Sequence, residues 1–336
     1  MKKNRKFLTI ASFLIPLFCL EIFNTASLAR GNIALETFKS EIEKRSRPIL
    51  KKFKQKRKTR GFTYFKGKIE IEELQDQITF HYYKSLSKKS KSKPLILIFP
   101  GLTGLTPLDY YMGRYYSKRG YNVAISHYRD EANELDPDNI DISMKNGILA
   151  SLGVLDTVSE FEEVDSEQIA LLGYSFGGIR ASFLATLEER LSPVIVIVGS
   201  ASLSRTLGQS KFPAVRKIRE IHMEKLEETC VKKYEEYLKN KLTFEPSEHL
   251  INCNTSNYLT VTSKLDTAVP WEVQKSLVSQ LTDPQHICFK TLGHCTSVCW
   301  FVIRHLNKSL ELLKDVWRQE DSILRIPFID PYEDQI

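Results

Sequence analysis

The strongest chemical signal in the sequence is a serine flanked by glycines, in the run Gly173-Tyr174-Ser175-Phe176-Gly177-Gly178. Residues 168–173 form an apolar run that predicts a buried strand, and residues 178–189 have the pattern of a helix. A sharp turn from strand to helix holds a serine hydroxyl above the sheet, and small neighbours let the backbone pass without Cβ clashes. The pattern therefore predicts a nucleophile at Ser175.

A serine becomes a nucleophile only beside a base that a third group orients. In the strand-turn-helix arrangement an acid and then a histidine follow in chain order, each after a later strand. Asp266 follows the predicted strand 257–262, and His294 follows a short predicted strand over 286–291. We therefore predict Asp266 as the orienting acid and His294 as the base. The alternatives are a turn or capping role for Asp266 and an ordinary loop position for His294.

The other histidines are less well placed for a role in catalysis. Five of them either precede the serine or fall in an expected insertion, before a strand or inside the last predicted helix: His127, His222, His249, His286 and His305. Acyl transfer also needs donors for the negative charge that develops on the carbonyl oxygen. By position these are the backbone N–H of Phe176, directly after the serine, and that of Leu102, after Pro100-Gly101 at the end of a predicted strand.

The elements that would position these residues alternate between strand and helix. An antiparallel pair is predicted over 62–74 and 77–86, and the later strands are apolar runs separated by helical patterns. The strands are expected over 94–99, 121–127, 168–173, 193–198 and 257–262, and the helices over 108–119, 140–161, 178–189, 270–281 and 295–317. This α/β pattern predicts a mostly parallel central sheet with helices on both faces. Residues 202–252, with a charged helical segment over 215–241, exceed a single crossover and predict a small helical cap.

The N-terminal part differs in composition from the rest. Residues 1–29 resemble an export signal, with a cationic start, an apolar stretch over 7–20 and small residues at Ser27 and Ala29. An N-terminal membrane anchor is the alternative, although Pro16 and Glu21 limit the apolar stretch to less than a spanning helix needs. Residues 30–60 are basic and predict a solvated helix or tether, and residues 61–336 form the main domain. The basic run over 44–60 could also contact an anionic membrane surface.

The amino-acid composition excludes several other classes of protein. The chain has 336 residues, of which 42% are hydrophobic and 26% charged, values that exclude a disordered or collagen-like chain. The formal charge of +7 lies mostly near the N-terminus and gives no reason to propose a nucleic-acid partner. No dinucleotide or zinc motif appears, so we expect no cofactor and no metal. Cys295 and Cys299, four residues apart beside His294, are interpreted as apolar packing, with disulfides undecided.

Together, the loop 99–104, the serine run 173–178, residues 266–270 and Gly293-His294 resemble the α/β-hydrolase superfamily over about residues 61–317. Within it the chain is most similar to bacterial esterases and the YheT-like branch. It departs from many members at Pro100-Gly101, where they have His-Gly, so the second donor rests on backbone position alone.

The resemblance and the residues together imply an exported serine hydrolase that cleaves a small-molecule or lipid carboxylic ester through an acyl-enzyme on Ser175. The alternatives are an acyltransferase, a thioesterase or an amidase with the same triad. A non-enzymatic binding protein on an inactive hydrolase scaffold is a further alternative.

Overall fold

Nine strands form one twisted sheet in the computed structural model, which describes residues 36–323 except residues 75, 89, 189, 244 and 251–254. The order across the sheet is β1-β2-β3-β5-β4-β6-β7-β8-β9. The strands are β1 (Ile49–Lys58), β2 (Phe62–Glu70), β3 (Ile78–Ser85), β4 (Lys93–Phe99), β5 (Asn122–His127), β6 (Val164–Tyr174), β7 (Leu191–Ile197), β8 (Tyr258–Ser263) and β9 (Gln285–Phe289). Strands β1, β2, β3 and β5 pair antiparallel in that order, and β5, β4 and β6 to β9 are parallel. The predicted α/β fold with a mostly parallel sheet is confirmed.

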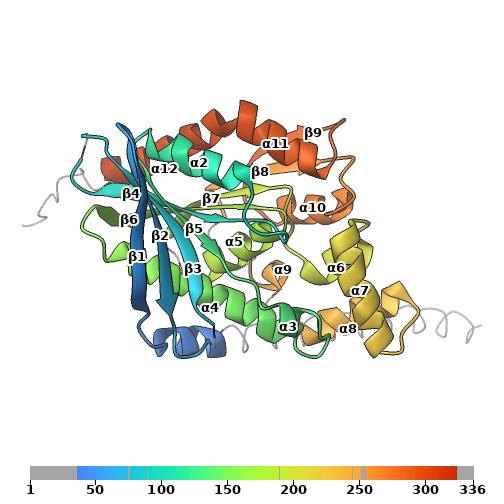
Figure 1. Ribbon diagram of the computed structural model, residues 1–336. Helices are drawn as coiled ribbons and strands as arrows, with labels where there is room; N and C mark the ends of the chain where they lie inside the picture. Colours follow the sequence, from blue (N-terminus) through green and yellow to red (C-terminus); the bar gives the residue numbers. More distant parts are fainter. Residues whose placement is uncertain are drawn as a thin grey trace, which may run out of the picture.

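Helices cover both faces of this sheet (Figure 1). Helices α2 (Pro107–Ser117), α11 (His294–Arg304) and α12 (Leu306–Ile323) pack on one face, and α4 (Ile140–Ser159) and α5 (Phe176–Leu187) pack on the other. Helix α10 (Trp271–Val278) connects β8 to β9, and the short α3 (Glu131–Glu134) precedes α4. The sheet is therefore the middle of three layers.

The central strands are buried on both sides, which explains their continuous apolar runs. In β4, Leu95 and Leu97 belong to the hydrophobic cluster on the α4 and α5 face. Ile96 and Ile98 belong to the cluster on the α2 and α12 face. Successive side chains of a strand point to opposite faces, so a strand between two helical layers must be apolar at every position.

The described part of the cap between β7 and β8 contains four helices, α6 (Leu203–Gln209), α7 (Pro213–Lys225), α8 (Val231–Lys241) and α9 (Pro246–His249). The single helical segment predicted over 215–241 is wrong, because the chain turns between α7 and α8, where Glu227 has a φ of 52°. Tyr234 is fully buried and its hydroxyl lies 2.8 Å from Nδ1 of His222. Nε2 of the same His222 lies 2.8 Å from the backbone oxygen of Glu134, which fixes the cap to α3.

Two other sequence interpretations need correction. Residues 30–60 are expected to be a solvated helix or tether, and residues 36–43 are helical, but Phe38 and Ile42 of this helix are buried. Ile49–Lys58 instead forms β1 and pairs with β2, although all ten residues are exposed. The helix predicted over 295–317 is two helices, because α11 ends at Arg304, His305 leaves the helical conformation and α12 starts at Leu306. The proposed export signal, residues 1–29, lies outside the described residues. Within residues 36–323, no described helix has the length and apolar character needed to cross a membrane.

Candidate active site

Ser175 lies at the turn between β6 and α5, in a backbone conformation that few side chains adopt. Its φ is 56° and its ψ is −127°, and its N–H donates to the backbone oxygen of Ile197 at 2.9 Å. A Cβ at Gly173 would lie 2.2 Å from the oxygen of Gly177, and one at Gly177 would lie 2.1 Å from the oxygen of Phe99. The glycines are therefore required by close backbone approach, as the sequence predicted.

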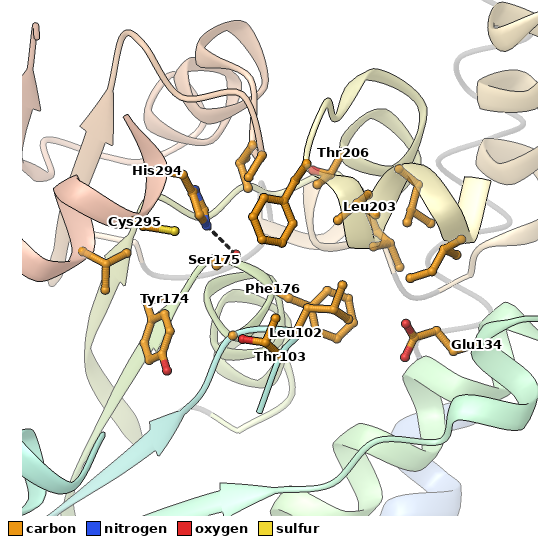
Figure 2. Close-up of a pocket in the computed structure, with 18 of the residues that line it drawn as sticks. Leu102, Thr103, Glu134, Tyr174, Ser175, Phe176, Leu203, Thr206, His294 and Cys295 are labelled. Atoms are coloured by element: carbon orange, nitrogen blue, oxygen red, sulfur yellow. Dashed lines mark hydrogen bonds between the residues drawn. The ribbon is translucent and has the colours of Figure 1, made fainter. Parts of the chain in front are cut away.

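The three predicted triad side chains are brought together in one hydrogen-bonded line. Nε2 of His294 lies 2.8 Å from Oγ of Ser175, the contact drawn as a dashed line in Figure 2. Nδ1 of the same ring lies 2.7 Å from Oδ2 of Asp266. Because a carboxylate only accepts hydrogen bonds, the proton of the neutral ring belongs on Nδ1, which leaves Nε2 free to accept the serine proton. The arrangement can therefore activate Ser175.

The carboxylate of Asp266 accepts hydrogen bonds at both oxygens, and its side chain has no exposed surface. Its Oδ1 accepts the backbone N–H groups of Ala268 at 2.8 Å and Val269 at 2.9 Å. Its Oδ2 accepts from His294 and also from Nε2 of Gln274 at 2.8 Å. These four donors compensate the buried charge and fix the carboxylate in the orientation that the imidazole needs.

Gln274 is a site residue that the sequence reasoning missed. It lies on α10 and is fully buried. Besides its bond to Asp266, Nε2 donates to the backbone oxygen of Val269 at 2.6 Å, and Oε1 accepts from the backbone N–H of Ser263 at 2.9 Å. Its position eight residues after the acid, on the helix that follows, is the one sequence signal that could have pointed to it.

The predicted oxyanion donors, Leu102 and Phe176, both line the cavity around Ser175 (Figure 2). In the described part of the chain neither backbone N–H donates to a protein acceptor, so both remain available to a ligand oxygen. The loop that carries Leu102 is tight, because a Cβ at Gly101 would lie 3.1 Å from the ring of Tyr174 and 3.5 Å from Cβ of Ser175.

The buried side chain of Asp109 forms hydrogen bonds that hold the loop carrying Leu102. Asp109 has no exposed surface, and its Oδ2 accepts from the backbone N–H of Thr106 at 2.7 Å and from the hydroxyl of Tyr174 at 2.9 Å. Burial raises the pKa of Asp109, and these hydrogen bonds oppose the shift. The contacts fix the ring of Tyr174 against Gly101, and so position the loop of Leu102, the second predicted donor.

The cavity in front of Ser175 has a volume of about 160 Å³ and is mostly apolar. One side extends beneath the cap, between α4, α6 and α7, towards Glu134 (Figure 2). Apolar residues line this cap side: Ile140, Met144, Leu203, Leu207, Val215 and Ile218. At its far end Glu134 is almost buried and forms a two-point ion pair with Arg129, with N–O distances of 2.6 and 2.8 Å.

The other side of the cavity corrects the interpretation of two cysteines. Cys295 and Cys299 were expected to be apolar packing, but both line the cavity beside His294, and Cys295 is exposed. Cys230 and Cys288 are also free thiols, and Cys253 lies outside the described residues. In contrast, the cap residues Leu226, Tyr234 and Leu238 do not line the cavity, as expected of packing residues.

The other histidines do not take part in the triad. His127 lies behind the loop of Leu102, where a Cβ at Gly104 would approach its Nε2 to 2.7 Å. His222 and His249 are buried in and beneath the cap. Within the described ranges, no group of three His, Cys, Asp or Glu side chains is arranged to hold a metal ion.

Comparisons with known proteins agree with this fold. Residues 155–308, which contain the whole triad, match the family described as BAAT / Acyl-CoA thioester hydrolase C terminal. A search of curated protein sequences gave no match.

Solved structures give the fold over most of the chain. Acetyl xylan esterase 1 from Thermoanaerobacterium sp. JW/SL YS485 is 14% identical, with a TM-score of 0.69, covering 85% of this chain and 93% of that one. The acetyl xylan esterase from Paenibacillus sp. R4 is 16% identical, with a TM-score of 0.64 and coverage of 77% and 87%. Est1E from Butyrivibrio proteoclasticus is 16% identical, with a TM-score of 0.52 and coverage of 78% and 99%.

The strand order, the serine turn and the structural similarities define the fold. The chain has the α/β-hydrolase fold, and residues 155–308 are similar to the family described above. The finer placement beside the YheT-like branch finds no support in the comparisons and stays a prediction.

Proposed function

We propose that the protein is a serine hydrolase that cleaves a carboxylic ester through an acyl-enzyme on Ser175. One observation carries the proposal: a single imidazole, that of His294, contacts both the serine hydroxyl at 2.8 Å and a buried carboxylate at 2.7 Å. This geometry is the one that general-base activation of a serine requires.

The reaction has two halves. In the first, His294 takes the proton of Ser175 as Oγ bonds to the ester carbon, and the N–H groups of Leu102 and Phe176 stabilise the oxyanion. The C–O bond to the alcohol then breaks, and the imidazolium of His294 returns the proton to the leaving alcohol. In the second half a water loses its proton to His294, attacks the acyl carbon and releases the acid with Ser175 restored. Asp266 stabilises the imidazolium in both halves.

The cavity supports an apolar acyl group. Leu203, Leu207 and Ile218 of the cap and Met144 of α4 line the same cavity as Ser175. Burying an apolar chain there gains roughly 0.8 kcal/mol per methylene. A panel of p-nitrophenyl esters from acetyl to octanoyl tests the proposal, with Ser175→Ala as the matched control. We expect kcat/KM to rise with acyl length until the cavity is filled, and no turnover above background by the variant.

A thioester is the second candidate substrate, because the family that matches residues 155–308 is described by acyl-CoA thioester hydrolysis. Comparing kcat/KM for the oxygen ester and the thioester of the same acyl group distinguishes the two candidate substrates. A higher kcat/KM for the oxygen ester supports the proposed esterase activity. A higher kcat/KM for the thioester would assign thioesterase activity instead. Product analysis with added alcohol or amine distinguishes an acyltransferase, and an anilide substrate tests for an amidase. The intact triad argues against the binding-protein alternative.

Export is a separate proposal that rests on the sequence of residues 1–29. Cleavage after Ala29 would leave Arg30 as the first residue of the mature chain. N-terminal analysis of the protein recovered from its producing cells tests this directly. An intact Met1 in a membrane-bound fraction would instead support the anchor.

A further inference from the structure

The outer ribbon of the sheet, β1 with β2, carries four lysines on one face; we call them the lysine array. In the antiparallel register Lys52 lies opposite Lys68, and Lys54 lies opposite Lys66. Residues directly opposite each other on antiparallel strands point to the same face, with Cβ atoms about 4.5–5.5 Å apart. The ribbon forms the outer edge of the sheet, labelled β1 and β2 in Figure 1.

This arrangement has an energetic cost in the isolated protein. Like charges directly opposite one another destabilise a strand pair. Among residues 36–323 none of the four lysines forms an ion pair with a described residue. The nearby Glu70 forms an ion pair with Lys51, with an N–O distance of 2.7 Å. The array is therefore a concentrated positive charge that no carboxylate of the described residues neutralises in an ion pair.

The pKa of a neighbouring histidine, His81, is affected by the same positive charge. Lys66 lies opposite His81 of β3 in the sheet register. Burial lowers the pKa of His81 to about 4, and the charge of Lys66 acts in the same direction.

Protection of the sheet edge does not explain the whole array. Lysines on an edge strand prevent pairing with other chains, and this accounts for Lys52 and Lys54 on β1. Lys66 and Lys68 belong to β2, which is already paired on both sides, by β1 and β3. Their alignment opposite the lysines of β1 needs another reason.

We propose that the lysine array docks the protein onto an anionic lipid membrane through the phosphate headgroups. Charge complementarity is the first reason, because lysines near an anionic leaflet each strengthen binding by about fivefold. The second is an exposed apolar side chain on the same face: Ile49, opposite Glu70 in the register, is 58% exposed. Such a side chain can enter the lipid interface, whereas a nucleic-acid backbone offers it no apolar partner.

Vesicle co-sedimentation of the full chain tests the proposal. The probes are vesicles of pure phosphatidylcholine and vesicles with 30% phosphatidylglycerol. Residues 1–29 also carry positive charge, but the wild type and all variants share them, so a difference between proteins reports on the substituted lysines. We expect the preference for the anionic vesicles to fall at least tenfold in a Lys52→Gln, Lys54→Gln, Lys66→Gln, Lys68→Gln variant. The matched control replaces four exposed lysines of the cap instead, Lys217, Lys232, Lys233 and Lys239, and is expected to bind as the wild type does.

A single charge reversal keeps the proposal testable if the fourfold variant does not fold. Lys54→Glu places a carboxylate opposite Lys66, so we expect a higher urea midpoint at low salt together with weaker binding to anionic vesicles. Unchanged binding by the array variant or by Lys54→Glu would overturn the proposal. So would tighter binding to duplex DNA than to the anionic vesicles at equal salt, which would assign the array to nucleic acid.

Discussion

Replacing Gln274 with leucine tests how far the triad depends on the support of its acid. The substitution removes one of the four hydrogen bonds to the carboxylate of Asp266, the one at 2.8 Å from Nε2. A hydrogen bond to a charged group contributes about 1.5–3 kcal/mol. If that support is felt fully in the transition state, kcat falls by about 10- to 100-fold. The amides of Ala268 and Val269 still hold Oδ1, so the loss is smaller than complete failure of the acid.

The same substitution also lowers stability. The backbone oxygen of Val269 and the N–H of Ser263 lose their side-chain partner in a buried site. An unpaired buried polar group costs about 1–3 kcal/mol, so we expect a Tm several degrees below that of the wild type. KM should be unchanged, because Gln274 does not line the cavity.

Steady-state kinetics with one p-nitrophenyl ester and a thermal melt measure these effects together. Gln280→Leu is the matched control, because the buried Oε1 of Gln280 has no hydrogen-bond partner among the described residues. A kcat within twofold of the wild type despite a lower Tm would refute the reasoning. A raised KM at unchanged kcat would refute it as well, since it would place Gln274 in substrate binding.

Three further predictions concern the acid, the turn and the sheet. Asp266→Asn should fold normally and lose about 10⁴-fold in kcat, because an amide facing Nδ1 of His294 favours the wrong tautomer; a loss below tenfold would contradict this. Gly177→Ala should give little soluble protein, because its Cβ would lie 2.1 Å from the backbone oxygen of Phe99, and soluble yield with circular dichroism checks it. Because the folded-state pKa of His81, about 4, lies below its unfolded value, stability should fall as pH drops from about 6.5 towards 4. His81→Phe should reduce the difference in unfolding free energy between pH 7 and pH 5 by about 2 kcal/mol in urea titrations, and an unchanged difference would contradict the assignment.

The juxtaposition of the three candidate triad residues could be predicted from the sequence, because the chemistry of such a site specifies both residue type and chain order. Ser175 is marked by glycines that close backbone approach requires, and Asp266 and His294 each follow a strand of the parallel sheet. The structure brings all three together as expected. Gln274 carries no such mark, because a glutamine on a helix becomes part of the site only through the packing of α10 against β8.

The errors in the fold have a common physical origin. Residues 49–58 have the composition of a solvated segment, and they are solvated, but hydrogen bonds to β2 make them a strand. The breaks at Glu227 and His305 occur without a glycine or proline at those positions to signal them. The exposure of Cys295 depends on how the cap and α11 enclose the cavity. Such features are set by tertiary packing, which local patterns do not contain.

The most direct measurement of the central claim is fluorophosphonate labelling of the purified protein, with the modified peptide mapped by mass spectrometry. An activated serine in the observed geometry, with Nε2 of His294 at 2.8 Å from Oγ, should give one adduct on Ser175. The adduct should be absent from Ser175→Ala and strongly reduced in Asp266→Asn. No adduct on the folded wild-type protein, or an adduct on another residue, would contradict the proposed nucleophile.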